Sequence, residues 1–239
     1  VSWGARIMPI KILDSRGDGT YADLARAIIY AADHGARIIN MSLGGEEYSQ
    51  VVEEAIDYAR ERGCLLVAAA GNNGGTVLFP AASDGVLAVA ATDSGDRHWV
   101  GSNQGPQVDV AAPGVGIYST GRGGVYFSAT GTSMATPHVS GLAALIWSVA
   151  PELTPVQVSE RITSTAKDLG APGWDPAYGW GRIEAYPAVV GLAGCTVYLP
   201  LIMKGPGPLW PQSYHELKPG LGMQIPRLIA QMRWKRIPR

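Results

Sequence analysis

The sequence has few of the features that mark metal-binding, membrane-spanning or nucleic-acid-binding proteins. Charged residues make up 16% of the 239 residues and the formal net charge is −1, so the whole chain gives no argument for binding nucleic acid or a membrane surface. No apolar run reaches the roughly 20 residues that a transmembrane helix needs. The chain begins at Val1 without a signal-peptide pattern, which leaves its compartment open if the natural N-terminus lies upstream.

Cysteine is scarce as well. The two cysteines are Cys64 and Cys195, and no Cys/His cluster has the spacing of a zinc site. Cys64 precedes an apolar stretch, where we expect a buried free thiol. A disulfide between the two cysteines has no support in the sequence.

Small residues are abundant, and apolar stretches alternate between strand-like and helix-like patterns. We expect strands at residues 6–13, 38–42, 65–70, 86–91, 108–111 and 117–120. We expect helices at residues 21–34, 51–62, 132–150 and 155–163. This alternation predicts an α/β fold in which helices cover both faces of a mainly parallel sheet. A globular part of about 190 residues would bury roughly 70% of its unfolded surface, which is enough for a sizeable core.

The most informative stretch is the octapeptide GTSMATPH at residues 131–138, which follows a strand-like run and opens an apolar helix. Thr132 is the expected N-cap, and Ser133 is a candidate hydroxyl nucleophile at the helix N-terminus. Its small neighbours leave space for a substrate backbone, and its N–H lies where the helix favours an oxyanion. The simpler alternative is an ordinary helix capped by Ser or Thr.

This octapeptide resembles the nucleophile segment of the subtilisin-like serine proteases (subtilases). Three more segments match the family in its order: INMSLGG at residues 39–45, VAAAGNNG at 67–74 and YGWGRIEA at 178–185. They look like the family's substrate-binding strand, its oxyanion segment and the segment that closes its catalytic domain. The resemblance covers residues 7–190. It implies a subtilisin-like three-layer α/β/α fold, N-terminally truncated, with a partial catalytic domain at residues 1–194.

The resemblance implies roles for individual residues. Ser133 would be the nucleophile, and the side-chain amide of Asn72 would be the second oxyanion donor, although Asn72 could instead only stabilise its own loop. A polypeptide substrate would bind as an extended strand between two backbone segments. The implied substrate-binding residues are Gly17, Asp18, Gly19, Ser42, Leu43, Gly44 and Thr132, with a specificity pocket near Ala69, Gly71 and Phe79.

Two details follow for that pocket and its surroundings. The Phe79-Pro80 step resembles one that is cis in the family, so we expect a cis bond there. With Asn73 at the rim, the pocket would take an uncharged, medium or large apolar side chain. The chemistry requires no cofactor. Family habit adds structural calcium, at a site that the loops do not reveal, and secretion.

The match lacks two parts of the family's catalytic machinery. In the family the catalytic Asp and His precede the serine, on segments that would lie before Val1, and no His-Gly-Thr-His segment occurs in this sequence. The contexts of the four histidines favour structural or solvated roles: His34, His98, His138 and His215. Asp14 superficially resembles the family's aspartate, but Arg16 stands where glycine is needed. The chain alone should therefore accelerate peptide hydrolysis only about 10³- to 10⁴-fold over the reaction in water.

Two hypotheses from different classes remain. The first is a serine endopeptidase recorded here without its beginning, and the second is a non-catalytic protein that binds extended peptides. An esterase of the α/β-hydrolase type is disfavoured because Ala135 occupies the last position of Gly-x-Ser-x-Gly. A dinucleotide site at residues 71–75 lacks the Gly-x-Gly-x-x-Gly spacing. The sequence does not indicate an oligomeric state.

Residues 195–239 differ in composition from the rest of the chain. They are rich in proline and basic residues. We expect a poorly ordered C-terminal tail. The alternative is a tail that binds an anionic surface or a partner.

Overall fold

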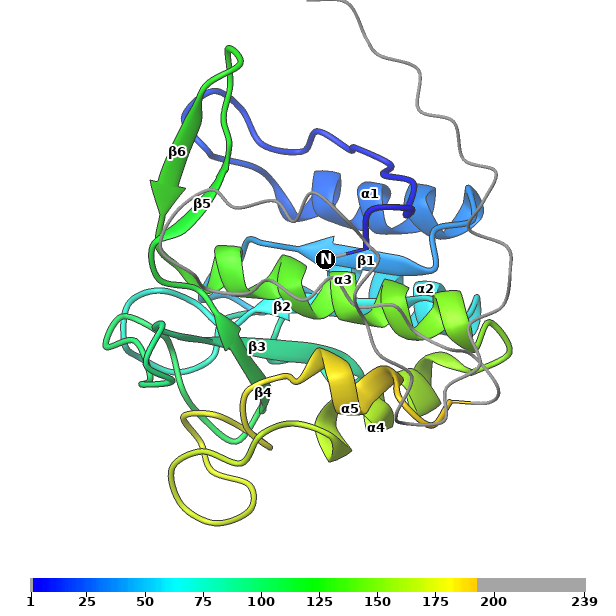
Figure 1. The fold of residues 1–239 in the computed structure, drawn as a ribbon. Helices are drawn as coiled ribbons and strands as arrows, with labels where there is room; N and C mark the ends of the chain where they lie inside the picture. The colour runs from blue at the N-terminus through cyan, green and yellow to red at the C-terminus, as the bar shows by residue number, and fades with distance from the viewer. Residues whose placement is uncertain (1, 193–239) are drawn as a thin grey trace, which may run out of the picture. The chain divides into compact units, whose positions relative to one another are not determined.

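The computed structural model describes residues 2–192 and shows a four-stranded parallel sheet between layers of helices (Figure 1). The elements in chain order are α1 (Tyr21–Asp33), β1 (Ile38–Met41), α2 (Gln50–Glu61), β2 (Leu65–Ala69), β3 (Val86–Thr92), β4 (Val108–Pro113), β5 (Ile117–Thr120), β6 (Tyr126–Ala129), α3 (Thr132–Val149), α4 (Pro155–Ser164) and α5 (Ala185–Val189). The strand order is β1-β2-β3-β4, and β5 and β6 form a separate antiparallel pair. The predicted three-layer α/β/α architecture is confirmed. The predicted tail at residues 195–239, with Cys195 and His215, lies outside the described residues.

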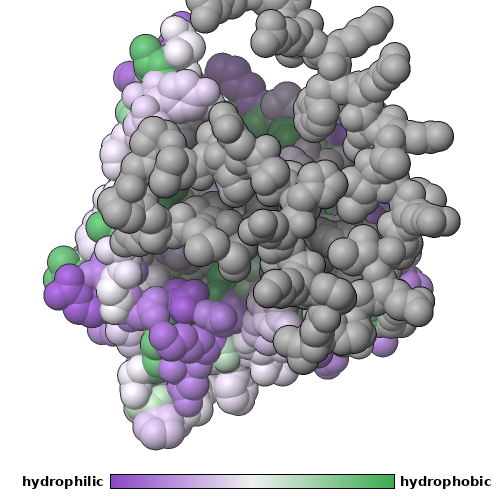
Figure 2. Space-filling model, viewed as in Figure 1, coloured by the Kyte–Doolittle hydropathy of each residue, from purple (hydrophilic) through white to green (hydrophobic). Residues whose placement is uncertain are grey.

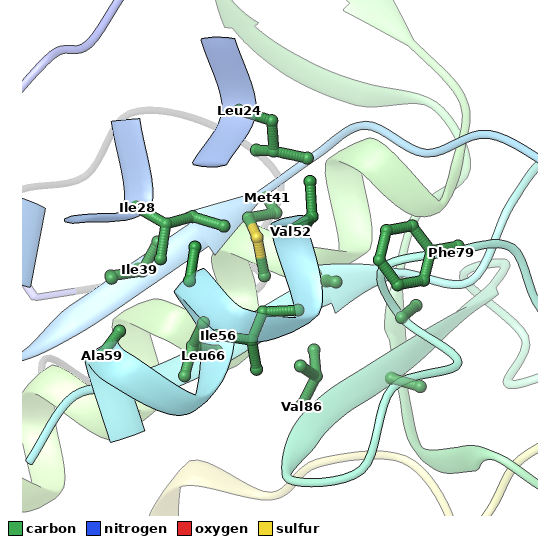
Figure 3. Close-up of a cluster of buried hydrophobic side chains, with 14 of the residues drawn as sticks. Leu24, Ile28, Ile39, Met41, Val52, Ile56, Ala59, Leu66, Phe79 and Val86 are labelled. Atoms are coloured by element: carbon green, nitrogen blue, oxygen red, sulfur yellow. The ribbon is translucent and has the colours of Figure 1, made fainter. Parts of the chain in front are cut away.

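The sheet is buried on both faces. Every residue of β2 is buried, and alternate side chains enter different cores. Leu66 and Ala68 belong to the cluster that β1 and β2 form with α1 and α2 (Figure 3), whereas Leu65 and Val67 pack with α3. A strand that is apolar on both faces has no polar alternation, which is why this stretch reads as a continuous apolar run.

The helices begin and end where the sequence provides capping groups. The hydroxyl of Thr20 accepts the N–H of Asp23 at the start of α1, and Gly35 takes a φ of +80° just beyond its end. Thr154 and Gln157 form a reciprocal capping box at the start of α4, with proline in its first turn. Local side chains therefore fix these helix boundaries independently of the core.

The strand predicted for residues 6–13 is wrong. The structure has no strand there, and residues 6–11 are exposed. A strand needs a neighbour for its backbone hydrogen bonds. β1, at the edge of the sheet, pairs with β2 alone, so within residues 2–192 the segment 6–13 does not pair with its open side. The apolar pattern is therefore present without the pairing that would make it a strand.

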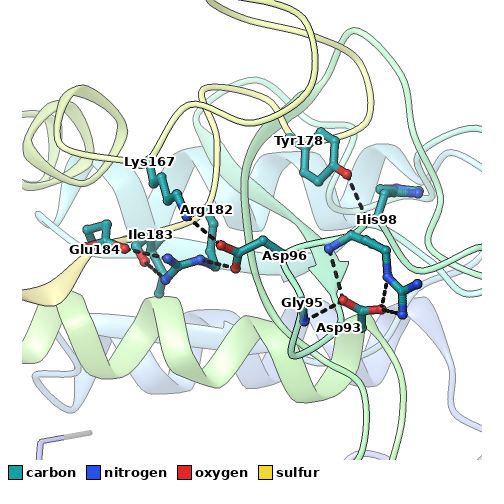
Figure 4. Close-up of polar contacts among 10 residues, drawn as sticks. Asp93, Gly95, Asp96, His98, Lys167, Tyr178, Arg182, Ile183 and Glu184 are labelled. Atoms are coloured by element: carbon teal, nitrogen blue, oxygen red, sulfur yellow. Dashed lines mark hydrogen bonds and ion pairs between the residues drawn. The ribbon is translucent and has the colours of Figure 1, made fainter.

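The loop after β3 is tied to the segment that follows α4 (Figure 4). Asp96 accepts from Lys167 over 2.8 Å and contacts Arg182 over 2.6 Å, and Arg182 also contacts Glu184 over 2.6 Å. The bond from Lys167, followed by the charge of Arg182, holds the pKa of Asp96 below its usual value. These contacts fix residues 181–183 along the outer edge of β4, where Ile183 N–H donates to the carbonyl of Ala111 over 3.0 Å.

The visible surface of the described part mixes polar and apolar side chains (Figure 2). Several aromatic side chains of the β5–β6 hairpin are exposed, among them Tyr118, Tyr126 and Phe127. The helices of the described part are all too short or too polar to cross a membrane.

Candidate active site

Ser133 is the second residue of α3, and two hydrogen bonds join it to Ser42, the residue that follows β1. The Ser133 hydroxyl donates to the carbonyl oxygen of Ser42 over 3.2 Å, and the Ser42 hydroxyl donates to the carbonyl oxygen of Ser133 over 3.0 Å. This exchange places the candidate nucleophile against the predicted substrate-binding strand. Its N–H lies in the first helical turn, where no intrahelical acceptor exists.

A further chain of hydrogen bonds supports Ser42. Asn40 donates through Nδ2 to the hydroxyl of Ser42 over 3.0 Å, and Ser140 on α3 donates to Oδ1 of Asn40 over 2.8 Å. No local sequence pattern singles out Asn40 as a supporting residue. Its partner Ser140 lies 100 residues away in the sequence, so only the fold brings the two side chains together.

The prediction that Thr132 caps α3 is wrong. The residue before the helix is Gly131, and Thr132 is the first helical residue and fully buried. Its hydroxyl donates to Oδ1 of Asn72 over 2.8 Å and accepts the N–H of Gly71 over 3.2 Å. A hydroxyl that is bound to this loop is not available to cap its own helix. Thr132 therefore connects α3 to the loop after β2.

Asn72 presents one end of its side-chain amide to Thr132. Oδ1 of Asn72 also accepts the backbone N–H of Thr132 over 2.8 Å. Because a backbone N–H can only donate, this bond identifies the end of the amide that faces α3, and Nδ2 lies on the other side. Asn72 is exposed. Such a donor beside a helix N-terminus can stabilise negative charge that develops on an oxygen atom.

Asn103 holds the loop that carries Asn72, and the sequence analysis missed it. It is fully buried, and its Oδ1 accepts the N–H groups of Asn73 over 2.9 Å and Gly75 over 3.2 Å. Its Nδ2 donates to the carbonyl of Thr76 over 2.6 Å. The partners precede Asn103 by 27 to 30 residues, so local sequence patterns contain no signal for this anchor.

Replacing Asn103 with alanine should lower the free energy of unfolding by about 2 kcal/mol, because three backbone groups lose their partner at once. Urea unfolding followed by circular dichroism measures the change. Gln104→Ala is the matched control, since the side chain of Gln104 is exposed, and it should alter stability by less than about 0.5 kcal/mol. An equally small loss for Asn103→Ala would mean that water replaces the amide.

The predicted substrate-binding residues 17–19 lie before α1, on another segment than Ser42 and Ser133. Gly17–Gly19 belong to an exposed turn that the carboxylate of Asp14 closes. Oδ1 of Asp14 accepts the N–H groups of Arg16 over 2.8 Å and Asp18 over 3.0 Å. The bonds from Asp18 and then Arg16 lower the pKa of Asp14. Gly17 has a φ of +91°, which the turn requires and which glycine adopts without strain.

The main chain of Phe79 lies beside the predicted substrate-binding segment, but its ring does not. The Phe79–Pro80 bond is cis, as predicted. The ring, however, is buried in the α1–α2 core between Tyr21 and Tyr48, with centroid distances of 5.9 and 5.4 Å (Figure 3). The N–H of Gly45 donates to the carbonyl of Phe79 over 2.8 Å. The main chain of residue 79 thus borders the segment 42–45, while its ring contributes to the core.

Three of the four histidines lie in the described residues, and each contacts a group other than Ser133. His34 and His138 place Nδ1 2.8 and 2.9 Å from the carbonyl four residues earlier. His98 packs edge-on against Tyr178, and burial lowers its pKa. The hydroxyl of Ser133 donates to a backbone carbonyl rather than to any of these rings.

Neither a metal site nor a cysteine contributes to this region. Residues 2–192 contain no group of three or more His, Cys, Asp or Glu side chains that could hold a metal ion. The structural calcium that the family resemblance implies therefore has no identified site in these residues. Cys64 is a buried free thiol whose Sγ donates to the carbonyl of Ala36 over 3.0 Å, and burial raises its pKa.

A cavity of about 720 Å³ lies beside α1, and another of about 790 Å³ lies between α2 and α4. Neither cavity is lined by Ser133 or Asn72.

A serine at the N-terminus of a helix packed on a parallel sheet, next to an outward-facing amide, combines a candidate nucleophile with an oxyanion donor, the groups that acyl-transfer enzymes use. Comparison with known proteins identifies the family. The chain belongs to the subtilase family, whose sequence model, "Subtilase family", matches residues 1–181.

Individual relatives are similar over most of this chain. It is 46% identical over 185 residues to "Thermophilic serine proteinase" of Bacillus sp. (strain AK1), covering 77% of this chain and 45% of that protein. It is 42% identical over 186 residues to "Thermitase" of Thermoactinomyces vulgaris, covering 77% of this chain and 65% of that protein. A solved structure, "Structure of Prenylagaramide maturation protease PagA", matches with a TM-score of 0.68 at 32% identity, covering 74% of this chain and 70% of that chain. This chain therefore spans about half to two thirds of the length of these curated relatives.

Proposed function

We propose that this chain carries the nucleophile and oxyanion site of a serine endopeptidase. Ser133 Oγ would attack the scissile carbonyl carbon while its proton passes to a base, and the C–N bond would then break as the amine leaves with that proton. Water would hydrolyse the resulting ester on Ser133, which releases the carboxylic acid and restores the hydroxyl. Nδ2 of Asn72 and the N–H of Ser133 would bind the oxyanion. One observation carries the proposal: the bonds from Thr132 occupy Oδ1 of Asn72 and leave Nδ2 as the outward-facing end of an exposed amide.

The substrate would be a polypeptide in extended conformation along residues 42–44. Main-chain hydrogen bonds give such binding its affinity, and side-chain pockets give it selectivity. The chemistry uses no cofactor. Kinship with subtilisins is the basis for two further proposals, that the protein is secreted and that its peptidase domain ends near Gly194.

We also propose that the 239 residues alone turn over substrate poorly. Ser133 donates to Ser42 and not to a histidine, and the base and its orienting acid would come from a segment beyond this sequence. The same observation favours the second candidate function, a peptide-binding protein without catalysis. The two candidates differ in whether Ser133 becomes reactive once a base is supplied.

A chimaera tests this difference. The part of Thermitase that carries its catalytic Asp and His would be fused before Val1, and both the chimaera and the 239-residue chain would be treated with a fluorophosphonate probe. We expect the chimaera to label at Ser133 and the shorter chain to remain unlabelled, because phosphonylation needs a base to take the serine proton.

Ser133→Ala in the chimaera is the control and should abolish labelling. A folded chimaera that does not react, or that reacts equally well without Ser133, would refute the endopeptidase proposal and leave peptide binding. Labelling of the 239-residue chain at Ser133 would show that a base within it reaches the serine.

A further inference from the structure

Residues 98–105, which follow β3, support the candidate oxyanion loop at residues 71–75. Three backbone hydrogen bonds of 3.0 Å join the two segments: from Gly74 N–H to Gly101, from Asn103 N–H to Gly71 and from Gln104 N–H to Gly75. The buried amide of Asn103 adds bonds to N–H groups of the same loop. A movement of residues 98–105 would therefore displace the loop that carries Asn72.

A second segment, residues 175–179, holds both ends of residues 98–105. The hydroxyl of Tyr178 accepts the N–H of His98 over 2.8 Å (Figure 4). The carbonyl of Pro176 accepts the N–H of Gly105 over 2.9 Å. The segment behind the oxyanion loop is thus fixed at its first and last residues.

The contact at His98 contains buried polar atoms that can change charge. Nε2 of His98 and Oδ2 of Asp175 are buried and have no hydrogen-bond partner within residues 2–192. Asp175 is only 7% exposed, and its Oδ1 accepts the N–H groups of Ala177 and Tyr178 over 2.8 and 2.9 Å. The ring of Tyr178 packs edge-on against the imidazole at a centroid distance of 5.7 Å. The contact therefore encloses a titratable ring beside a fixed carboxylate.

The surroundings of His98 disfavour its charged form. Burial lowers the pKa of His98, and the negative charge of Asp175 offsets part of that effect. The other charged side chains of the adjoining loops form ion pairs of their own: Asp93 with Arg97, and Asp96 with Lys167 and Arg182. Among the described residues, Asp175 is therefore the charged group that acts on the imidazole.

We propose that His98 is a pH-dependent positioning residue for the oxyanion site. While the imidazole is neutral, residues 175–179 hold residues 98–105 and, through them, Asn72. When the imidazole takes up a proton, the contact with Tyr178 opens so that water reaches the charge, because a charged ring is costly to bury. The inference rests on the proposed function and specifies how that site is regulated: acid weakens it through a contact that involves neither Ser133 nor Asn72.

The direction of the pH dependence follows from burial. Because the closed contact lowers the pKa of His98, the closed state is fully favoured above pH 6.5 and loses this advantage as the pH falls through the lowered pKa. A local measurement is required, since other groups, such as Asp109, make the stability of the whole chain depend on pH with the opposite sign.

Hydrogen–deuterium exchange with mass spectrometry measures this opening in the 239-residue chain. After correction for intrinsic exchange, we expect residues 71–75 and 98–105 to open roughly tenfold more often at pH 5 than at pH 7.5, the scale of effect that burying a charged imidazole produces. His98→Phe keeps a ring against Tyr178 and cannot be protonated, so it should remove this difference. Asp175→Asn removes the compensating charge and should enlarge it.

His34→Phe is the matched control, because His34 is exposed at the end of α1, and it should leave the pH dependence unchanged. Tyr178→Phe removes the acceptor of the His98 N–H and should raise opening at both pH values. The inference would be overturned by a pH dependence that is absent from the unmodified chain, that persists in His98→Phe or that shrinks in Asp175→Asn.

Fluorophosphonate labelling of the chimaera connects this contact to the site. Between pH 7.5 and pH 5, labelling should fall more in the chimaera than in its His98→Phe variant, in proportion to the closed fraction that exchange reports. Both proteins share the same base, so its titration cancels in the comparison. Equal pH profiles would overturn the regulatory inference. A chimaera that never labels, although exchange shows the expected opening, would refute the endopeptidase proposal alone.

Discussion

Asn72→Ala should lower the residual ester hydrolysis of the 239-residue chain by about 10² to 10³, the known cost of removing an oxyanion donor of this kind from subtilisin. The expectation follows from the orientation of the amide. Oδ1 accepts two bonds from Thr132, so Nδ2 is the group available to a developing oxyanion. The measurement is the release of p-nitrophenol from a peptide p-nitrophenyl ester.

Ser133→Ala should have a much smaller effect in the same assay, below about threefold. In subtilisin the members of the catalytic triad act as a unit, so that removing the serine or the histidine alone costs about as much as removing all three. If no base reaches Ser133, the unit is already incomplete, and the remaining rate depends on binding and the oxyanion site. The order of the two effects, with Asn72 above Ser133, distinguishes a site without its base from a complete one.

Asn73→Ala is the matched control for Asn72, because among residues 2–192 the Asn73 side chain bonds only within its own loop, where it accepts the N–H of Gly75 over 3.2 Å. It should leave the rate within about threefold. If Asn72→Ala were equally mild, Asn72 would not bind the oxyanion. A loss of more than tenfold for Ser133→Ala would show that a base inside these residues reaches the serine.

The sequence indicated elements whose cause is local. The buried strand at residues 65–70 and the helix that begins after Thr154 carry their own signals, an apolar run and a capping box, and both are present in the structure. Residues 6–13 carry a similar apolar pattern and form no strand, because a strand also depends on a neighbour, which a single segment does not encode. Local patterns therefore predicted the elements better than their pairing.

The same distinction applies to the candidate site. Motif resemblance located Ser133 and Asn72, which the structure brings together through Thr132. The local capping pattern misassigned the hydroxyl of Thr132 because the competing partner lies 60 residues away. Asn103 was missed for the same physical reason, since its contacts join segments that lie 27 to 30 residues apart in sequence. The motifs indicate the candidate reactive groups, and the fold determines what surrounds them.

A carboxylate on β4 that is largely but not fully buried provides the second large expected effect. Asp109 accepts the N–H of Ala88 at Oδ2 over 2.8 Å, at the point where the register between β3 and β4 shifts. Burial raises the pKa of Asp109 from 3.8 to about 6, and the bond from Ala88 offsets only part of that rise. The folded chain therefore binds this proton more tightly than the unfolded chain does.

The sign of the pH dependence follows from that difference. The contribution of Asp109 to stability is fully present below pH 4 and is lost as the pH rises through about 6, because the folded state must then hold a buried charge. The difference of 6 − 3.8, about 2.2 pKa units, corresponds to a loss of about 3 kcal/mol from the free energy of unfolding above pH 6.

Asp109→Asn keeps an oxygen for the N–H of Ala88 and removes the ionisation. We expect it to raise the free energy of urea unfolding by about 2 to 3 kcal/mol at pH 8 and to change it little at pH 4. Asp57→Asn is the control, since its carboxylate is exposed, and it should show no such pH-dependent gain. Destabilisation by Asp109→Asn at pH 8 would mean that the charged carboxylate is itself stabilised in the fold, and the proposed cost of burying it would then be wrong.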